Sequence, residues 1–183
     1  MVLKLKLFHT ITPASDGSVI PRYTVEEYLN SDNYKNSIES GSILCTVSHR
    51  DRALTASPDG EKLKGIVGKD DNILLNKSAV GKITKIFLPD DPQDEWVYGI
   101  CEMFDENLMD EDSAKNIKFI KGLIRNGVKL SSSSVVISYW NQNEVCEKLI
   151  SIKGNDFTLN PAFSKGGKEP AGVIGILEDD RRD

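Results

Sequence analysis

Cysteine and histidine are scarce in this chain of 183 residues, which contains three of the former and two of the latter. The cysteines, Cys45, Cys101 and Cys146, lie far apart and are odd in number, so neither a disulfide framework nor a CxxC metal site is expected. Two histidines without neighbouring cysteines also exclude a histidine-rich metal centre. The sequence therefore predicts a reducing compartment and a function that uses no metal and no other cofactor.

Long apolar runs and an excess of positive charge are also missing. No segment approaches the ~20 apolar residues of a membrane span, and the N-terminus alternates lysine with leucine, unlike a signal peptide. The 28 acidic residues outnumber the 23 basic ones, which gives a net charge of −5. Nucleic acids and anionic membranes bind basic surfaces, so neither is expected as a partner.

The residues that are present fit one domain of ordinary size. Apolar residues make up 39 % of the chain and charged residues 28 %, which is the balance of a soluble globular protein. We expect a single domain over residues 1–165, followed by a flexible, glycine-rich and charged tail over residues 166–183.

Apolar periodicity predicts a strand-rich α+β domain. Leucines alternate with lysines between residues 3 and 7, as in a half-buried strand. Further strands are expected at 42–49, 79–88, 95–104, 129–140, 144–152 and 156–163. A helix should begin near Thr24, a second should cover 117–124 before the Asn126-Gly127 stop, and 50–78 should form a long loop with at most one short element. These elements suit a closed or nearly closed β-barrel flanked by helices.

Few side chains in this sequence could act as a general base. His9 follows the first strand and is interpreted as a structural residue at a strand end. His49 ends an apolar strand just before a long polar loop, where a rigid scaffold often displays functional groups. Cys45 is expected on the same strand face as His49. However, Cys45 and Cys101 are embedded among apolar residues, which favours buried and inert thiols.

The serine run at residues 131–134 breaks a local rule, because serine has low β-propensity and an obvious strand continues after it. The run is either functional or a polar strand edge whose hydroxyls bond to the local backbone. Alternation places Ser131 and Ser133 on one face and Ser132 and Ser134 on the other. Asp156 is either a turn residue or the acidic member of a Ser/His/Asp set.

Several segments occur in an order that resembles the tailed-phage prohead core protease, a maturation protease similar to herpesvirus assemblin. They are ILCTVSH, KITKIFL, WVYGICEMFD, a helix that ends at Gly127, VKLSSSSVVI and DFTLNPAF. The resemblance covers roughly residues 41 to 165. It implies a herpesvirus-protease-like barrel and a serine endopeptidase with Ser131 as nucleophile, His49 as general base and Asp156 as the group that orients the histidine.

This sequence departs from the family pattern at three positions. Ser133 stands where the family has an arginine, Ser134 where it has a small residue or glycine, and Arg50 where a proline often follows the histidine. Ser132, and after it Ser133, are therefore the next candidates for the nucleophile. A backbone N–H next to the serine is the expected oxyanion donor.

The resemblance also implies substrates and a location. Scaffold and capsid proteins would be cleaved in the host cytoplasm, inside the assembling prohead, and herpesvirus relatives suggest a homo-oligomer. Ile176-Leu177-Glu178 fits the Ile/Leu-x-Glu context cleaved by some relatives, so self-cleavage near Glu178 is an expectation. Two alternatives stay open: a catalytically inactive capsid- or scaffold-binding module on the same fold, and a peptidase that uses Cys45 or Cys146.

Overall fold

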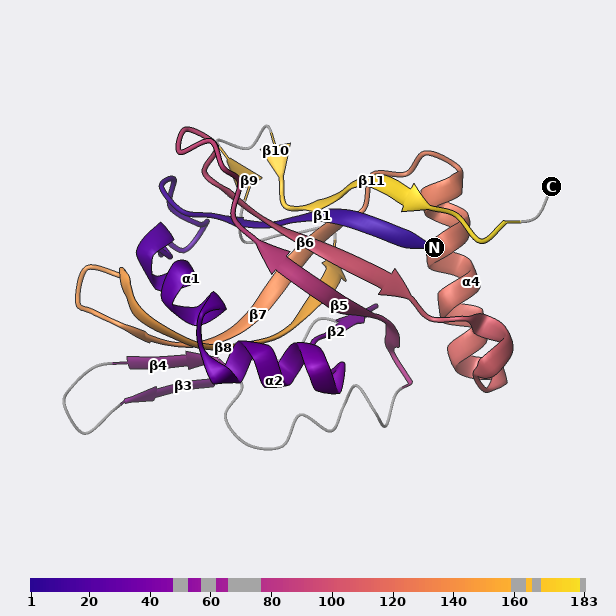
Figure 1. Ribbon diagram of the computed structural model, residues 1–183, viewed down its shortest axis with the longest axis horizontal. Coiled ribbons are helices and arrows are strands. Elements are labelled where there is room, and N and C mark those ends of the chain that lie inside the picture. Colours follow the sequence, from indigo (N-terminus) through magenta and orange to yellow (C-terminus); the bar gives the residue numbers. More distant parts are fainter. Residues whose placement is uncertain (48–52, 57–61, 66–76, 159–163, 166–168, 182–183) are drawn as a thin grey trace.

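The computed structural model describes residues 1–47, 53–56, 62–65, 77–158, 164–165 and 169–181 (Figure 1). The helices are α1 (Arg22–Leu29), α2 (Asp32–Ser40), the 3₁₀ turn η1 (Glu106–Leu108) and α4 (Glu111–Arg125). The strands are β1 (Val2–His9), β2 (Leu44–Thr46), β3 (Ala53–Ala56), β4 (Lys62–Gly65), β5 (Ala79–Phe87), β6 (Trp96–Met103), β7 (Ser131–Trp140), β8 (Cys146–Thr158), β9 (Ser164–Lys165), β10 (Glu169–Pro170) and β11 (Gly172–Glu178).

Seven of these strands form a closed barrel within the described part of the chain. Their order is β11-β1-β6-β5-β2-β8-β7, and a pairing between β11 and β7 closes the circle. The pairing of β2 with β8 is parallel and the other barrel pairings are antiparallel. The predicted strand-rich α+β barrel is therefore confirmed.

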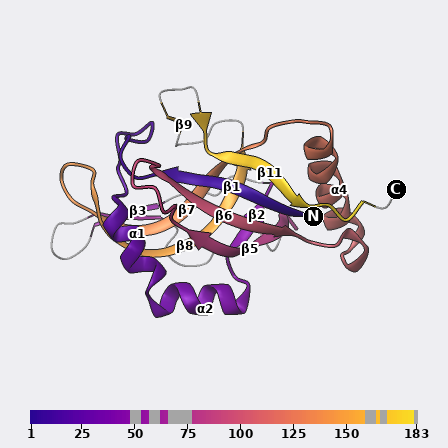
Figure 2. The same cartoon turned by 45° about the horizontal axis from the view of Figure 1, so that its top comes forward.

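The three α-helices of the described residues lie outside the barrel. α1 and α2 pack near β8, whereas α4 lies at the other end, beside the N-terminus and the end of β11 (Figures 1 and 2). The predicted second helix is α4, which Asp110 caps by accepting a hydrogen bond from the Ser113 amide (2.9 Å) and which Asn126 ends. Its isoleucines at 117, 120 and 124 are buried, as their helical spacing predicts.

The first helical region differs from the prediction. Two helices occur there, and Thr24 lies inside α1, where its hydroxyl donates to the Pro21 carbonyl (2.7 Å) instead of capping the helix. The Ser31 hydroxyl caps α2 by accepting a bond from the Tyr34 amide (3.3 Å), and Gly41 ends it with a positive φ of 64°. α2 buries no residue fully, and only Tyr34 and Ile38 pack against the core, so its apolar stripe is short.

Three strand predictions also need correction. The segment 50–78 contains two short strands, since β3 pairs with β4, and β4 in turn pairs with β7. Asp156 does not begin a separate strand, because β8 runs without interruption to Thr158. The strand predicted to end at His49 is described only as β2, which ends at Thr46, and His49 lies outside the described residues.

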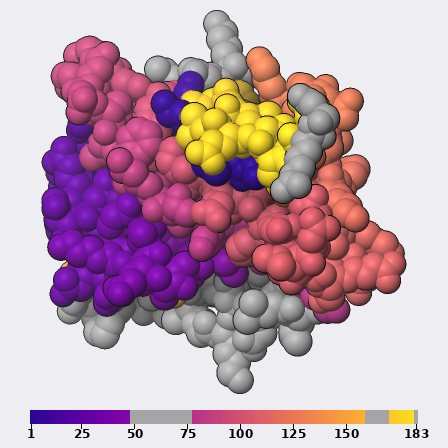
Figure 3. All heavy atoms as spheres, turned by 45° about the vertical axis from the view of Figure 1, so that its right-hand side comes forward, coloured from indigo at the N-terminus to yellow at the C-terminus, as the bar shows by residue number. Residues whose placement is uncertain are grey.

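The expectation of a flexible tail from residue 166 is wrong for Gly172–Glu178. This segment is β11, and it pairs along its length with β1. Figure 3 shows β11 in yellow against the indigo first strand. The barrel domain therefore extends beyond residue 165, to Glu178.

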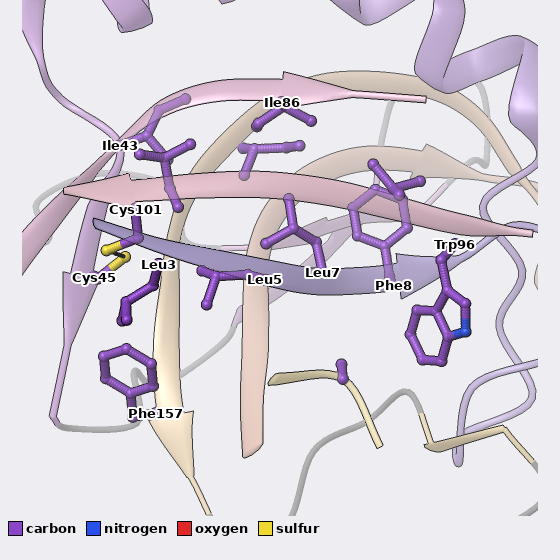
Figure 4. Packing of buried hydrophobic residues seen from close by; sticks show 14 of the residues in the cluster. Leu3, Leu5, Leu7, Phe8, Ile43, Cys45, Ile86, Trp96, Cys101 and Phe157 are labelled. Atoms are coloured by element: carbon purple, nitrogen blue, oxygen red, sulfur yellow. Dashed lines mark hydrogen bonds between the residues drawn. The ribbon is translucent and has the colours of Figure 1, made fainter. Parts of the chain in front are cut away.

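The core fills the barrel interior. The alternating leucines of β1 point inward and are at most 1 % exposed, together with Phe8 and Cys101 (Figure 4). The intervening lysines point outward, and the Lys6 ammonium lies 5.0 Å from the centre of the Trp96 ring. Burial of these apolar side chains stabilises the closed barrel.

Candidate functional site

The serine run begins β7 and faces β8 without a shift in register between residues 131 and 135. Ser132 and Ser134 lie opposite Phe157 and Asn155 on the interior face, and the Ser134 hydroxyl is 3.4 Å from the Leu7 carbonyl. Ser131 lies opposite Thr158. The predicted alternation of the run is therefore confirmed: Ser131 and Ser133 share the outer face of the barrel wall.

Asp156 shares this outer face and lies directly opposite Ser133. Its side chain is fully buried, and one carboxylate oxygen accepts a hydrogen bond of 2.6 Å from the Thr46 hydroxyl. Thr46 is the parallel neighbour of Asp156 at the end of β2. The hydroxyl fixes the orientation of the carboxylate, which can accept several bonds at once.

The described chain stops just short of His49. The Val47 amide donates to the Ser78 carbonyl (3.0 Å), which anchors the chain two residues before the histidine. His49, the predicted general base, lies outside the described residues.

Cross-strand spacing distinguishes Ser131 from Ser133. Directly opposed residues have Cβ atoms about 4.5–5.5 Å apart, whereas diagonal neighbours are about 7 Å apart. Ser133 is directly opposed to Asp156 and Ser131 is its diagonal neighbour. An imidazole that bonds to both a hydroxyl and a carboxylate needs the wider gap, so this register favours Ser131.

Solvent access also separates the serines. Ser131 is half-buried, whereas the three serines that follow it are buried, with exposures of 0 % to 7 %. A nucleophile must be reachable by its substrate, and Ser131 is the member of the run that meets this condition best.

The seam between β7 and β11 holds Ser131 in place. Ser131 is paired with Gly172, and hydrogen bonds of 2.9 Å on either side link the Ser132 amide to the Ala171 carbonyl and the Val173 amide to the Leu130 carbonyl. The Ser132 amide already donates its hydrogen bond to the Ala171 carbonyl. This amide is therefore not the oxyanion donor that was expected next to the serine. Neither Thr46 nor Gly172 was recognised from the sequence as part of the site.

A groove of about 470 Å³ opens beside Ser131. One wall is the connection from α4 to β7, including Val128 and Leu130, and the other is β11, including Ile174 and Ile176. The groove was not predicted from the sequence, because residues 166–183 were expected to form a flexible tail. The short apolar run GVIGIL, rich in β-branched residues, was the available signal.

The thiols are poorly suited to nucleophilic catalysis. Cys45 and Cys101 are fully buried in the core, and their sulfur atoms lie 3.1 Å apart. Burial raises the pKa of Cys146 to about 12, which keeps this thiol protonated at neutral pH. His9 is fully buried with its ring edge-on to Trp96, at 5.0 Å between ring centres, in agreement with the structural interpretation of this histidine.

Neither a metal centre nor a membrane helix is found among the described residues. No three His, Cys, Asp or Glu side chains in that part of the chain gather in a way that could hold a metal ion. No helix there is long and apolar enough to cross a membrane. Comparisons with protein-family models, with curated proteins and with solved structures find no match for this chain.

Proposed function

We propose that this protein is a serine endopeptidase of the prohead-protease type, with Ser131 as nucleophile, His49 as general base and Asp156 as the group that orients the histidine. The observation that carries the proposal is the position of Asp156, which is buried, bonded to Thr46 and diagonal to Ser131 on the outer barrel face. Thr46, Asp156 and Ser131 lie on three neighbouring strands, β2, β8 and β7, and this proximity of an acid and a hydroxyl supports the proposal.

The chemistry follows from these positions. His49 accepts the proton of the Ser131 hydroxyl while the serine oxygen attacks a peptide carbonyl. The protonated histidine then gives this proton to the leaving amine. Water, activated by the same base, hydrolyses the acyl-enzyme and regenerates the serine. Asp156 stabilises the imidazolium and keeps the ring in the tautomer that accepts the proton.

The substrates follow from the sequence resemblance. We propose scaffold and capsid proteins, cleaved inside the assembling prohead. Self-cleavage after Glu178 would require the end of β11 to leave β1, because Glu178 is paired with Val2. A chain that carries out this step therefore acts on another copy or on a partly opened barrel.

Labelling with a fluorophosphonate probe tests the proposal, because the probe reacts with an activated serine hydroxyl and loses fluoride. We expect one adduct on the full-length wild-type chain and none on Ser131→Ala. Ser132→Ala is the matched control, since Ser132 faces the interior and should keep the labelling. Loss of labelling in Ser133→Ala, with Ser131→Ala still labelled, would assign the nucleophile to Ser133 instead.

The second candidate is an inactive capsid- or scaffold-binding module. Two observations favour it: the Ser132 amide is committed to the barrel seam, and a serine occupies position 133 where the family has an arginine. Absence of labelling in every variant, together with no cleavage of a co-expressed scaffold protein by the wild type, would support this module and refute the peptidase.

A further inference from the structure

Exposed apolar side chains concentrate on the groove beside Ser131. Val128, Ile174 and Ile176 line it and are 43 %, 46 % and 42 % exposed. Apolar groups that gather in this way on a soluble protein often mark a binding surface. The groove volume of about 470 Å³ falls in the range of pockets that hold ligands.

The groove and the candidate nucleophile lie on the same face of the barrel. Gly172 is opposite Ser131, and both residues line the groove together with Ile174 and Ile176. A molecule that rests on Ile174 and Ile176 therefore extends toward the Ser131 hydroxyl.

One edge of β11 is open along this groove. On one side β11 pairs with β1 from Gly172 to Glu178. On the other side its pairing with β7 is confined to Gly172, with one further bond from the Val173 amide. No other described strand pairs with β11 beyond this point. An open strand edge can accept an extended peptide as an additional strand.

We propose that the groove binds an extended polypeptide with apolar side chains at alternate positions, which adds to the free edge of β11 and presents a peptide bond to Ser131. The inference rests on the proposed function and names its substrate class. Alternate side chains of an added strand share a face, and Ile174 and Ile176, which both line the groove, offer that face apolar contacts. Lys6 and Lys129 also line the groove, and none of the acidic residues that the structure describes does, which disfavours a strongly basic segment.

Peptide binding to the inactive full-length Ser131→Ala chain tests this inference. The probes are two fluorescein-labelled heptapeptides, blocked at both ends, which differ only in carrying leucine or asparagine at two alternate positions. Fluorescence anisotropy should give a dissociation constant at least about tenfold lower for the leucine peptide, because only leucine removes apolar surface from water.

Substitutions within the groove should remove this preference. Ile174→Asp in the Ser131→Ala background should raise the dissociation constant of the leucine peptide to that of the asparagine peptide. Ile11→Asp is the control, since Ile11 is also exposed (66 %) but does not line the groove. Val128→Asp repeats the test on the opposite wall, in case the change in β11 prevents folding.

The outcomes separate this inference from the proposed function. Equal affinity for both peptides, or unchanged binding in folded Ile174→Asp and Val128→Asp, overturns the groove proposal even if the wild type reacts with the fluorophosphonate. A leucine preference that these substitutions abolish supports the groove even if the wild type is not labelled, and in that case the peptidase proposal alone fails.

Discussion

Substitution of Gly172 by alanine should open the seam that holds Ser131. A Cβ atom at position 172 would lie 2.2 Å from the Leu130 carbonyl oxygen and 2.7 Å from the Ser131 Cα, and the φ angle there is +154°. Ordinary contacts at a Cβ are 3.4–4 Å, so β11 and the start of β7 must separate by roughly 1 Å, a displacement estimated from ordinary close packing.

The expected loss in the free energy of unfolding follows from the hydrogen bonds that this separation breaks and from backbone strain. The two hydrogen bonds beside the seam, from the Ser132 and Val173 amides, are each 2.9 Å long, and each contributes about 0.5–1.5 kcal/mol net. A non-glycine residue at such a φ adds about 1–3 kcal/mol of strain. Gly172→Ala should therefore lower the free energy of unfolding by about 2–6 kcal/mol, a large part of the 5–15 kcal/mol typical of a domain.

Urea unfolding monitored by circular dichroism measures this loss. Gly175→Ala is the matched control in the same strand, because no atom lies within 4 Å of its added Cβ and its φ is not positive. We expect the control to stay within about 0.5 kcal/mol of the wild type. A Gly172→Ala midpoint equal to that of Gly175→Ala would refute the close packing of the seam as the reason for this glycine.

Three further predictions concern charge, thiols and the interior serine. Lys121 is buried and bonds to Asp180 (2.6 Å) and Glu106 (2.7 Å); because Asp180 is partly exposed, Asp180→Asn should cost only about 1–2 kcal/mol in urea unfolding. The Lys121 hydrogen bond lowers the pKa of Asp180. The contribution of the ionised Asp180 carboxylate to the free energy of unfolding is therefore complete above about pH 4 and is lost as the pH falls further. Acid should destabilise the wild type more than Asp180→Asn. Iodoacetamide at pH 8 should leave Cys146 unmodified in the native protein and modify it in urea, as mass spectrometry would show. The Ser132 hydroxyl is buried without a hydrogen-bond partner in the described part of the chain, so Ser132→Ala should unfold at an equal or higher urea concentration.

Each of these predictions has a result that contradicts it. Parallel pH profiles for the wild type and Asp180→Asn would show that this carboxylate contributes nothing to acid sensitivity. Rapid alkylation of native Cys146 would mean that its thiol is not buried. A loss of more than about 1 kcal/mol in Ser132→Ala would indicate a partner for the hydroxyl, since removal of an unpaired polar group costs little.

Local patterns predicted the barrel class because they determine how each segment buries its apolar side. Leucine alternation in β1, the strand patterns of β5, β6 and β7 and the isoleucine face of α4 are short-range features, and each produced the element expected. α2 could not be predicted in the same way, because only Tyr34 and Ile38 pack against the core and the helix depends on its Ser31 and Gly41 caps.

The site was predictable only in part. Alternation within β7 gave the two faces of the serine run, but the register that makes Ser131 diagonal to Asp156 depends on pairing with another strand. The role of Gly172 depends on a pairing with Ser131, 41 residues earlier in the sequence. The apolar residues of this segment could indicate a strand, but tertiary pairing alone decides which residue lies opposite Ser131.

The arrangement of β11 has a consequence for synthesis. This strand closes the barrel by pairing with β1 at the other end of the described chain, and its first residue fixes Ser131. Ribosomes deliver the N-terminal strands first, and contacts between distant segments form slowly. A nascent chain that lacks β11 contains Ser131 but not the Gly172 pairing that holds this serine. Assembly of the candidate site is therefore delayed until translation has passed residue 178.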